Sequence, residues 1–174
     1  MIIPTRRKGP FDDPEWLFEF KYNGFRALCN IERGGCRFIS RNGNMLGRFD
    51  ALADQVAAAR HRRDGEVIVA DGAGRPQFYE LLRVPRSASY VAFDILWVDG
   101  TDLRSLPLSE RRKRLQAILP ANSQIISEAL FVEGRGRERA RTRPGPKEVL
   151  MRVRASSLNF DRRTMPSTLP KRSM

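Results

Sequence analysis

Residues 16–27 read WLFEFKYNGFRA, and this stretch decides how the rest of the chain is interpreted. Successive side chains of a β-strand point to opposite faces, so the alternation predicts a strand with one aromatic face: Trp16, Phe18, Phe20 and Tyr22. Glu19 and Lys21 are then predicted to project together from the other face. The pair Asn23-Gly24 predicts a turn at the end of this strand.

The sequence after this turn alternates between strand-like and helix-like segments. Extended segments at 25–32 and 36–40 continue an antiparallel hairpin system with the first strand. Helices are predicted at 49–60, 78–83 and 108–119, the last of them capped by Ser109. Further strands are predicted at 65–71, at 89–98 and, singly or as a pair, at 123–132. The pattern indicates an α+β fold of antiparallel sheets flanked by helices.

The composition is that of a globular protein. The chain has 174 residues, of which 41% are hydrophobic and 30% charged, and this fits one main domain. No apolar run approaches the ~20 residues that cross a membrane, and the N-terminus lacks the apolar segment of a secretory signal, so we expect a cytoplasmic protein. Cys29 and Cys36 fit neither a zinc site nor a disulfide framework and are interpreted as reduced packing residues. His61, in the polar run RHRRDG, is interpreted as a solvated loop residue.

Positive charge is concentrated towards the end of the chain. The net charge of +12 divides into +4 for residues 1–132, with 20 Lys and Arg against 16 Asp and Glu, and +8 for residues 133–174, with 12 against 4. Such a charge favours phosphate-rich partners. The change to an arginine-rich, glycine- and proline-broken composition predicts a folded domain at 1–134. Residues 135–174 are predicted to be a mobile, largely disordered basic tail, in which EVLMRVRAS could form one strand.

Lys21 is a candidate nucleophile. An amine at the end of an apolar strand, close to a glycine turn and to Arg26, can be favoured in its reactive neutral form by partial burial and by the neighbouring cation. A lysine in a strand is more often a solvated edge residue that prevents unwanted strand pairing. The strand by itself does not decide between these interpretations.

Four segments, in this order along the chain, resemble motifs of ATP-dependent DNA ligases. EFKYNGFRA at 19–27 is similar to the KxDGxR motif of nucleotidyltransferases, SRNG at 40–43 to the next ligase element, DGEVIV at 64–69 to the third and YVAFDILWVDG at 90–100 to the fourth. The following DLRSLPLSERRKRLQAIL is similar to the same stretch of bacterial ligases. The resemblance spans roughly residues 14–134 and implies an incomplete, ATP-grasp-like adenylation domain.

The resemblance implies a role for each residue of a nucleotide site. Lys21 would be the catalytic residue that takes up AMP from ATP, with Mg²⁺ neutralising the phosphates. The resemblance also implies four nucleotide-binding residues. Arg26 and Glu66 would bind the two ribose hydroxyls, Phe93 would stack on the adenine ring, and Glu19 would lie near the adenine edge. Arg41 would bind a phosphate, as at the 5′ end of a nick, so the implied partner is nicked duplex DNA.

Each of these residues also has an ordinary structural interpretation. Phe93 lies in VAFDILWV, where a buried strand residue is expected in any case. Glu66 could be a solvated carboxylate at a strand start, and Arg41 a turn residue. Arg26 could be a surface arginine paired with Glu32 or a similar acid.

The chain also departs from the family pattern. Asn23 stands where the family has an aspartate, which removes a carboxylate from the reaction centre. SEALFVEGRG resembles the stretch before the EGxxxK element, but neither that element nor the later lysine pair follows. Instead, GPKEVLMRVRASSLNFDRR resembles the opening strand of zinc-type alcohol dehydrogenases and quinone oxidoreductases, which indicates a truncated ligase joined to unrelated sequence.

Three rival functions follow from these departures. A non-catalytic nucleic-acid-binding remnant of a ligase is favoured by Asn23 and by the missing lysines. RNA-directed nucleotidyl transfer shares the first motif, but SERRKRL resembles DNA ligases. An oxidoreductase fragment is opposed by the lack of a nucleotide-binding GxGxxG motif.

Overall fold

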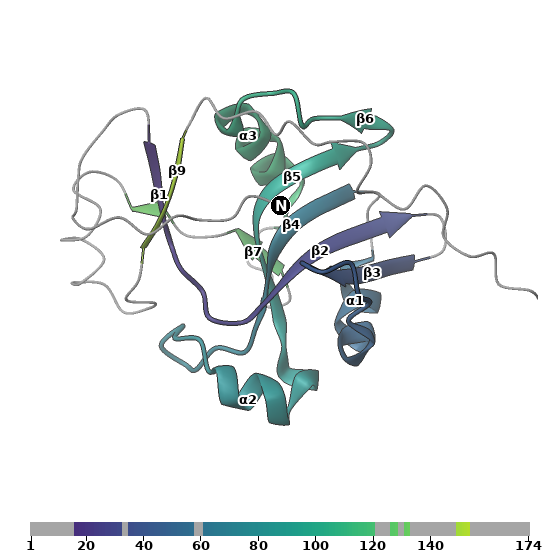
Figure 1. The fold of residues 1–174 in the computed structure, drawn as a ribbon, viewed down its shortest axis with the longest axis vertical. Helices are drawn as coiled ribbons and strands as arrows, with labels where there is room; N and C mark the ends of the chain where they lie inside the picture. The colour runs from purple at the N-terminus through teal and green to yellow at the C-terminus, as the bar shows by residue number, and fades with distance from the viewer. Residues whose placement is uncertain are drawn as a thin grey trace, which may run out of the picture.

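A computed structural model describes residues 16–32, 35–57, 61–120, 126–128, 131–132 and 149–153. In these residues the chain forms a large sheet, a small sheet and three α-helices (Figure 1). The α+β class predicted from the sequence is confirmed. None of the described helices is long and apolar enough to cross a membrane.

The large sheet is antiparallel along its main path. Its strands are ordered β3-β2-β4-β5-β6, with the bounds β2 Phe25–Glu32, β3 Gly35–Ser40, β4 His61–Ile68, β5 Ser89–Val98 and β6 Thr101–Asp102. A further strand, β7 (Ile126–Glu128), pairs with β5 in parallel. The predicted hairpin of 25–40 is confirmed as β2 and β3.

The small sheet holds the first strand. β1 (Trp16–Phe20) lies between β8 (Phe131–Val132) and β9 (Val149–Val153), antiparallel to both. The expectation that β1 pairs with β2 is therefore wrong: the Lys21–Gly24 segment carries the chain from one sheet to the other (Figure 1). The domain boundary near residue 134 stays a prediction, although β9 lies beyond it; residues 133–148 and 154–174 are outside the described part.

Two of the described α-helices pack against strands of the large sheet. η1 (Gly47–Phe49) leads into α1 (Asp50–Val56) beside β3, and α3 (Leu108–Ile118) packs on β5 (Figure 1). α2 (Phe78–Arg83) is followed by η2 (Pro85–Ser87). The predicted Ser109 cap is wrong, because α3 already begins at Leu108 with Pro107 as N-cap and no side-chain cap hydrogen bond.

The alternation of the strands divides the large sheet into two faces. One face carries most of the main core, in which Phe38, Tyr90 and Leu115 are buried together with Phe49 and Leu52 of η1 and α1. Cys29 and Cys36 lie in this core as free cysteines, with their Sγ atoms 3.3 Å apart, so their interpretation as reduced packing residues is confirmed. The second face carries a separate small cluster of Ile68, Val91 and Phe93.

Strand β4 begins earlier than the apolar pattern predicted. The polar residues from His61 onward belong to the strand, so the interpretation of His61 as a loop residue is wrong. Arg63 and Asp64 are buried because β4 lies in the sheet between β2 and β5, where even polar residues are enclosed by neighbouring strands. Strand pairing outweighed local polarity in this segment.

Candidate nucleotide site

Lys21 follows directly after β1 in the connection between the two sheets. Residues 21–24 have no regular secondary structure, and Lys21 is exposed whereas Glu19 is only 1% exposed. Strict alternation predicted that the two side chains project together from one face, but in the structure their environments differ. The partial burial that the sequence allowed for Lys21 is therefore not present.

Gly24 fixes this connection against β4. A Cβ atom at Gly24 would overlap the carbonyl oxygen of Val67 and come within 2.8 Å of Cγ2 of Ile68. The backbone N–H of Gly24 donates a hydrogen bond to the carboxylate of Glu66. A residue without a side chain is thus required where the Lys21 segment meets the strand that carries Glu66.

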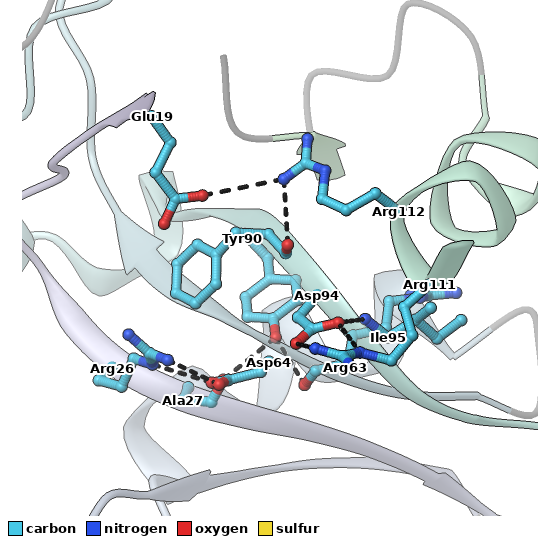
Figure 2. Close-up of polar contacts among 11 residues, drawn as sticks. Glu19, Arg26, Ala27, Arg63, Asp64, Tyr90, Asp94, Ile95, Arg111 and Arg112 are labelled. Atoms are coloured by element: carbon cyan, nitrogen blue, oxygen red, sulfur yellow. Dashed lines mark hydrogen bonds and ion pairs between the residues drawn. The ribbon is translucent and has the colours of Figure 1, made fainter. Parts of the chain in front are cut away.

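Arg26 is held by a bidentate pair with Asp64. Nε of Arg26 donates to Oδ1 of Asp64 at 2.8 Å, and Nη2 donates to Oδ2 at 2.6 Å (Figure 2). Glu66 lies directly opposite Arg26 in the β2–β4 register. The ordinary interpretation of Arg26, a pair with Glu32 or a similar acid, is met by Asp64 as the acid. Sequence reasoning missed Asp64, although it is the first residue of the DGEVIV motif and lies two positions before Glu66.

Phe93 forms the apolar wall beside this pair. The guanidinium carbon of Arg26 lies 4.3 Å from the centroid of the Phe93 ring, in cation–π contact. The β4–β5 register places Asp64 opposite Asp94 and Gly65 opposite Ala92, so Phe93 is the extra residue of a β-bulge. Bulges redirect side chains and are frequent beside functional sites. Phe93 is 2% exposed, as the structural interpretation also expected, and its stacking on adenine remains a prediction.

Burial and charge act in opposite directions on Glu66. Burial raises the pKa of Glu66 to about 7, while Arg26, the N–H of Gly24 and Lys21 act to lower it. For Arg26, burial would lower the pKa, but the bond and attraction to Asp64 and the charge of Glu66 outweigh it, and the pKa is raised. The site therefore contains a permanent cation, a carboxylate that titrates near neutral pH, and an exposed lysine.

Arg41 lies at the same end of the sheet as Arg26. Ser40, the last residue of β3, is opposite Ala27 of β2. The exposed turn that begins at Arg41 therefore follows at the end of β3 that lies beside Arg26. Arg41 is exposed at this position. The exposed turn also fits the structural interpretation, and a phosphate-binding role stays a prediction.

Two buried arginines of α3 connect the helix to the site, and sequence reasoning gave neither a role. Arg111 donates to both carboxylate oxygens of Asp94, at 2.8 and 2.9 Å. Nη1 of Arg112 donates to the carbonyl oxygen of Phe93 at 3.0 Å and lies 3.8 Å from Oε2 of Glu19 (Figure 2). Their signal in the sequence is an arginine pair within the helix LSERRKRLQAI, where solvated charges are the usual expectation.

Within the described residues, no group of three or more His, Cys, Asp or Glu side chains could hold a metal ion. Both oxygens of Asp64 are already occupied by Arg26. Magnesium is commonly held by one or two carboxylates together with substrate phosphates. Among the described residues, therefore, no carboxylate is assigned to a metal ion.

Comparison with known proteins identifies the family. The model of the ATP dependent DNA ligase domain matches residues 9–136. The chain is 33% identical over 126 residues to the multifunctional non-homologous end joining protein LigD of Mycolicibacterium smegmatis, covering 69% of this chain and 16% of that protein. For LigD of Pseudomonas aeruginosa the identity is 34% over 119 residues, covering 63% of this chain and 14% of that protein.

Solved structures give the same family. A mycobacterial DNA ligase D complexed with ATP and MES superposes with a TM-score of 0.75 and 25% identity, covering 89% of this chain and 54% of that chain. The ligase domain of LigD from M. tuberculosis gives a TM-score of 0.67 and 28% identity, covering 82% of this chain and 48% of that chain. The chain spans about one sixth of the length of the two LigD relatives from M. smegmatis and P. aeruginosa. By its motifs, its fold and these matches, the chain belongs to the ATP-dependent DNA ligase domain family.

Proposed function

We propose that this chain carries out the first step of DNA ligation, the transfer of AMP from ATP to Lys21. The observation that carries the proposal is the docking of the Lys21–Gly24 segment on β4, where Gly24 contacts Val67 and donates to Glu66. This contact joins the segment that carries the exposed amine of Lys21 to the strands that carry Arg26, Glu66 and Phe93. The mycobacterial relative complexed with ATP supports ATP as the nucleotide.

The proposed reaction is an in-line displacement at the α-phosphorus of ATP. Nζ of Lys21, in its neutral form, forms the N–P bond while the bond to the pyrophosphate oxygen breaks, and the amine proton passes to solvent. Arg26 and Glu66 would hold the ribose hydroxyls, Phe93 the adenine face and Glu19 its edge. Mg²⁺ bound with ATP supplies charge neutralisation of the phosphates.

The wider proposal is that AMP-loaded protein acts on nicked duplex DNA in repair or recombination, in the cytoplasm. Arg41 would bind the 5′-phosphate at the nick, since a guanidinium offers a planar fork of donors to phosphate oxygens. The ligase family and the end-joining relatives support DNA as the substrate.

The test is covalent labelling. The chain is incubated with magnesium and ATP labelled at the α-phosphate, and bound AMP is located by mass spectrometry of peptides. We expect AMP on Lys21 in the wild type and none in Lys21→Ala. Asn23→Asp, which restores the family carboxylate, should raise labelling about tenfold, the scale of one charged hydrogen bond. AMP that persists in Lys21→Ala overturns the assignment of the nucleophile.

A second candidate is a nucleic-acid-binding protein without catalysis. Asn23 in place of the family aspartate and the net charge of +12 favour it. If neither the wild type nor Asn23→Asp takes up AMP while the chain still binds DNA, this second function replaces the first.

A further inference from the structure

Arg112 is a buried cation that sequence comparison with the ligase motifs does not explain. It is 5% exposed and neighbours Arg111, which is fully buried. Adjacent residues of an α-helix point about 100° apart, so the two arginines reach different partners. Arg111 binds Asp94 and the carbonyl oxygen of Leu106, and this attaches α3 to β5.

The partners of Arg112 belong to two different sheets. Its Nη1 donates to the carbonyl oxygen of Phe93 in β5 and lies 3.8 Å from the carboxylate of Glu19 in β1. Figure 2 shows the side chain of Arg112 extending from its helix toward Glu19. Glu19 is itself 1% exposed and lies two positions before Lys21. Nη1 of Arg112 therefore contacts both the buried carboxylate of Glu19 and the backbone of Phe93, whose ring is expected to stack on the base.

The position of the Glu19 carboxylate has a chemical consequence for base selection. An ionised carboxylate only accepts hydrogen bonds. Adenine presents a 6-amino donor at its edge, whereas hypoxanthine presents a 6-oxo acceptor beside an N1–H donor. A carboxylate held in one place accepts from the amino group and repels the oxo group, but a carboxylate that can shift could accept from N1–H instead. Discrimination thus depends on how firmly the carboxylate is held.

We propose that Arg112 is a positioning residue that fixes Glu19 relative to Phe93 and thereby sets the preference of the site for adenine. The inference rests on the proposed function, because it takes Phe93 and Glu19 as the residues that meet the base. Arg112 does not touch the nucleotide and acts through these two partners.

The test measures the affinities of the full chain for ATP and for ITP, each with magnesium, by isothermal titration calorimetry. Wild-type protein should prefer ATP. Arg112→Met should reduce the ratio of the two affinities about tenfold, the loss of one charged interaction. Arg112→Lys keeps the charge but not the planar fork, so it should reduce the ratio to a smaller extent. Lys113→Met, which removes an exposed cation from the same helix, should leave the ratio unchanged.

The ratio of the ATP and ITP affinities separates a positioning role from a purely structural one. General loosening of the fold would weaken the binding of both nucleotides to the same extent and leave the ratio unchanged. If Arg112→Met does not fold, Arg112→Lys decides the question. In a Glu19→Gln background the Arg112 variants should change the ratio no further. A wild-type ratio retained in the Arg112 variants overturns the inference alone. A wild-type chain that binds neither nucleotide overturns the proposed function and this inference with it.

Discussion

Gly24 and Glu66 are the single residues on which the geometry and the charge of the site depend. Gly24 leaves room for the carbonyl oxygen of Val67, and its N–H holds the carboxylate of Glu66. Glu66 remains close enough to Arg26 and Lys21 for their charges to act on its pKa. Both residues can be tested without changing Lys21.

Gly24→Ala should displace the Lys21 segment from β4, because its Cβ would overlap backbone that cannot move without disturbing the strand. We expect a loss of about 1–3 kcal/mol in the free energy of unfolding and a loss of AMP uptake. Gly72→Ala is the matched control, since a Cβ at Gly72 meets nothing within 4 Å. Urea denaturation and AMP labelling check both variants, and equal behaviour of the two would contradict the docking role of Gly24.

The raised pKa of Glu66 predicts a stability that depends on pH. A folded-state pKa of about 7 against an ordinary value of 4.5 means that the folded protein binds the proton more tightly, so this contribution is fully present below pH 4.5 and is lost as pH rises through 7. The loss should be on the order of 1–3 kcal/mol. In Glu66→Gln this component of the pH dependence should disappear. Chemical denaturation at pH 5 and pH 8 measures the difference in the free energy of unfolding between the two pH values. If Glu66→Gln keeps the wild-type difference, Glu66 is not the group responsible.

At the scale of secondary structure elements, α3 is attached to β5 by a buried ion pair. Arg111 and Asp94 are 0% and 1% exposed in their side chains, and they form a bidentate pair. The apolar face of the helix is narrow, with Leu108 and Leu115 as its buried hydrophobic residues. The orientation of α3, and hence of Arg112, depends strongly on this pair.

Arg111→Met should destabilise the protein by about 3–5 kcal/mol, because it leaves the carboxylate of Asp94 buried without its cation. Lys113→Met, in contrast, breaks the exposed pair with Glu110, which is worth about 0–1 kcal/mol. Equilibrium unfolding in urea compares the two variants. Similar losses from both would show that the buried pair does not anchor the helix.

At the scale of the whole molecule, the positive charge is concentrated in residues 133–174. The excess of +8 in residues 133–174 includes five arginines at alternate positions, Arg135, Arg137, Arg139, Arg141 and Arg143. β9 lies in the same part of the chain and pairs with β1, so a deletion would also remove a strand. Substitution is therefore the cleaner test of the charge.

Replacing the five arginines by glutamine should weaken binding to duplex DNA and lower the log–log salt slope by about 0.9 for each DNA phosphate that is no longer neutralised. A double change to glutamine at Lys113 and Arg114, two exposed cations of α3, serves as the control for charge on that helix. Fluorescence anisotropy over a series of salt concentrations gives both slopes. If only the control variant changes the slope, the phosphate-binding cations lie on α3 and not on the five arginines.

The sequence by itself determined the α+β class, most elements and the ligase family, because strand alternation, turn residues and ordered motifs are local signals that survive without knowledge of the fold. It also singled out Lys21, Arg26, Glu66 and Phe93. Only the tertiary structure decided that β1 joins β8 and β9, that Arg26 pairs with Asp64, 38 positions away, and that Arg112 lies between Phe93 and Glu19. Local patterns specify which face a side chain occupies but not which strand lies opposite, and the pairing of buried charges follows from that register.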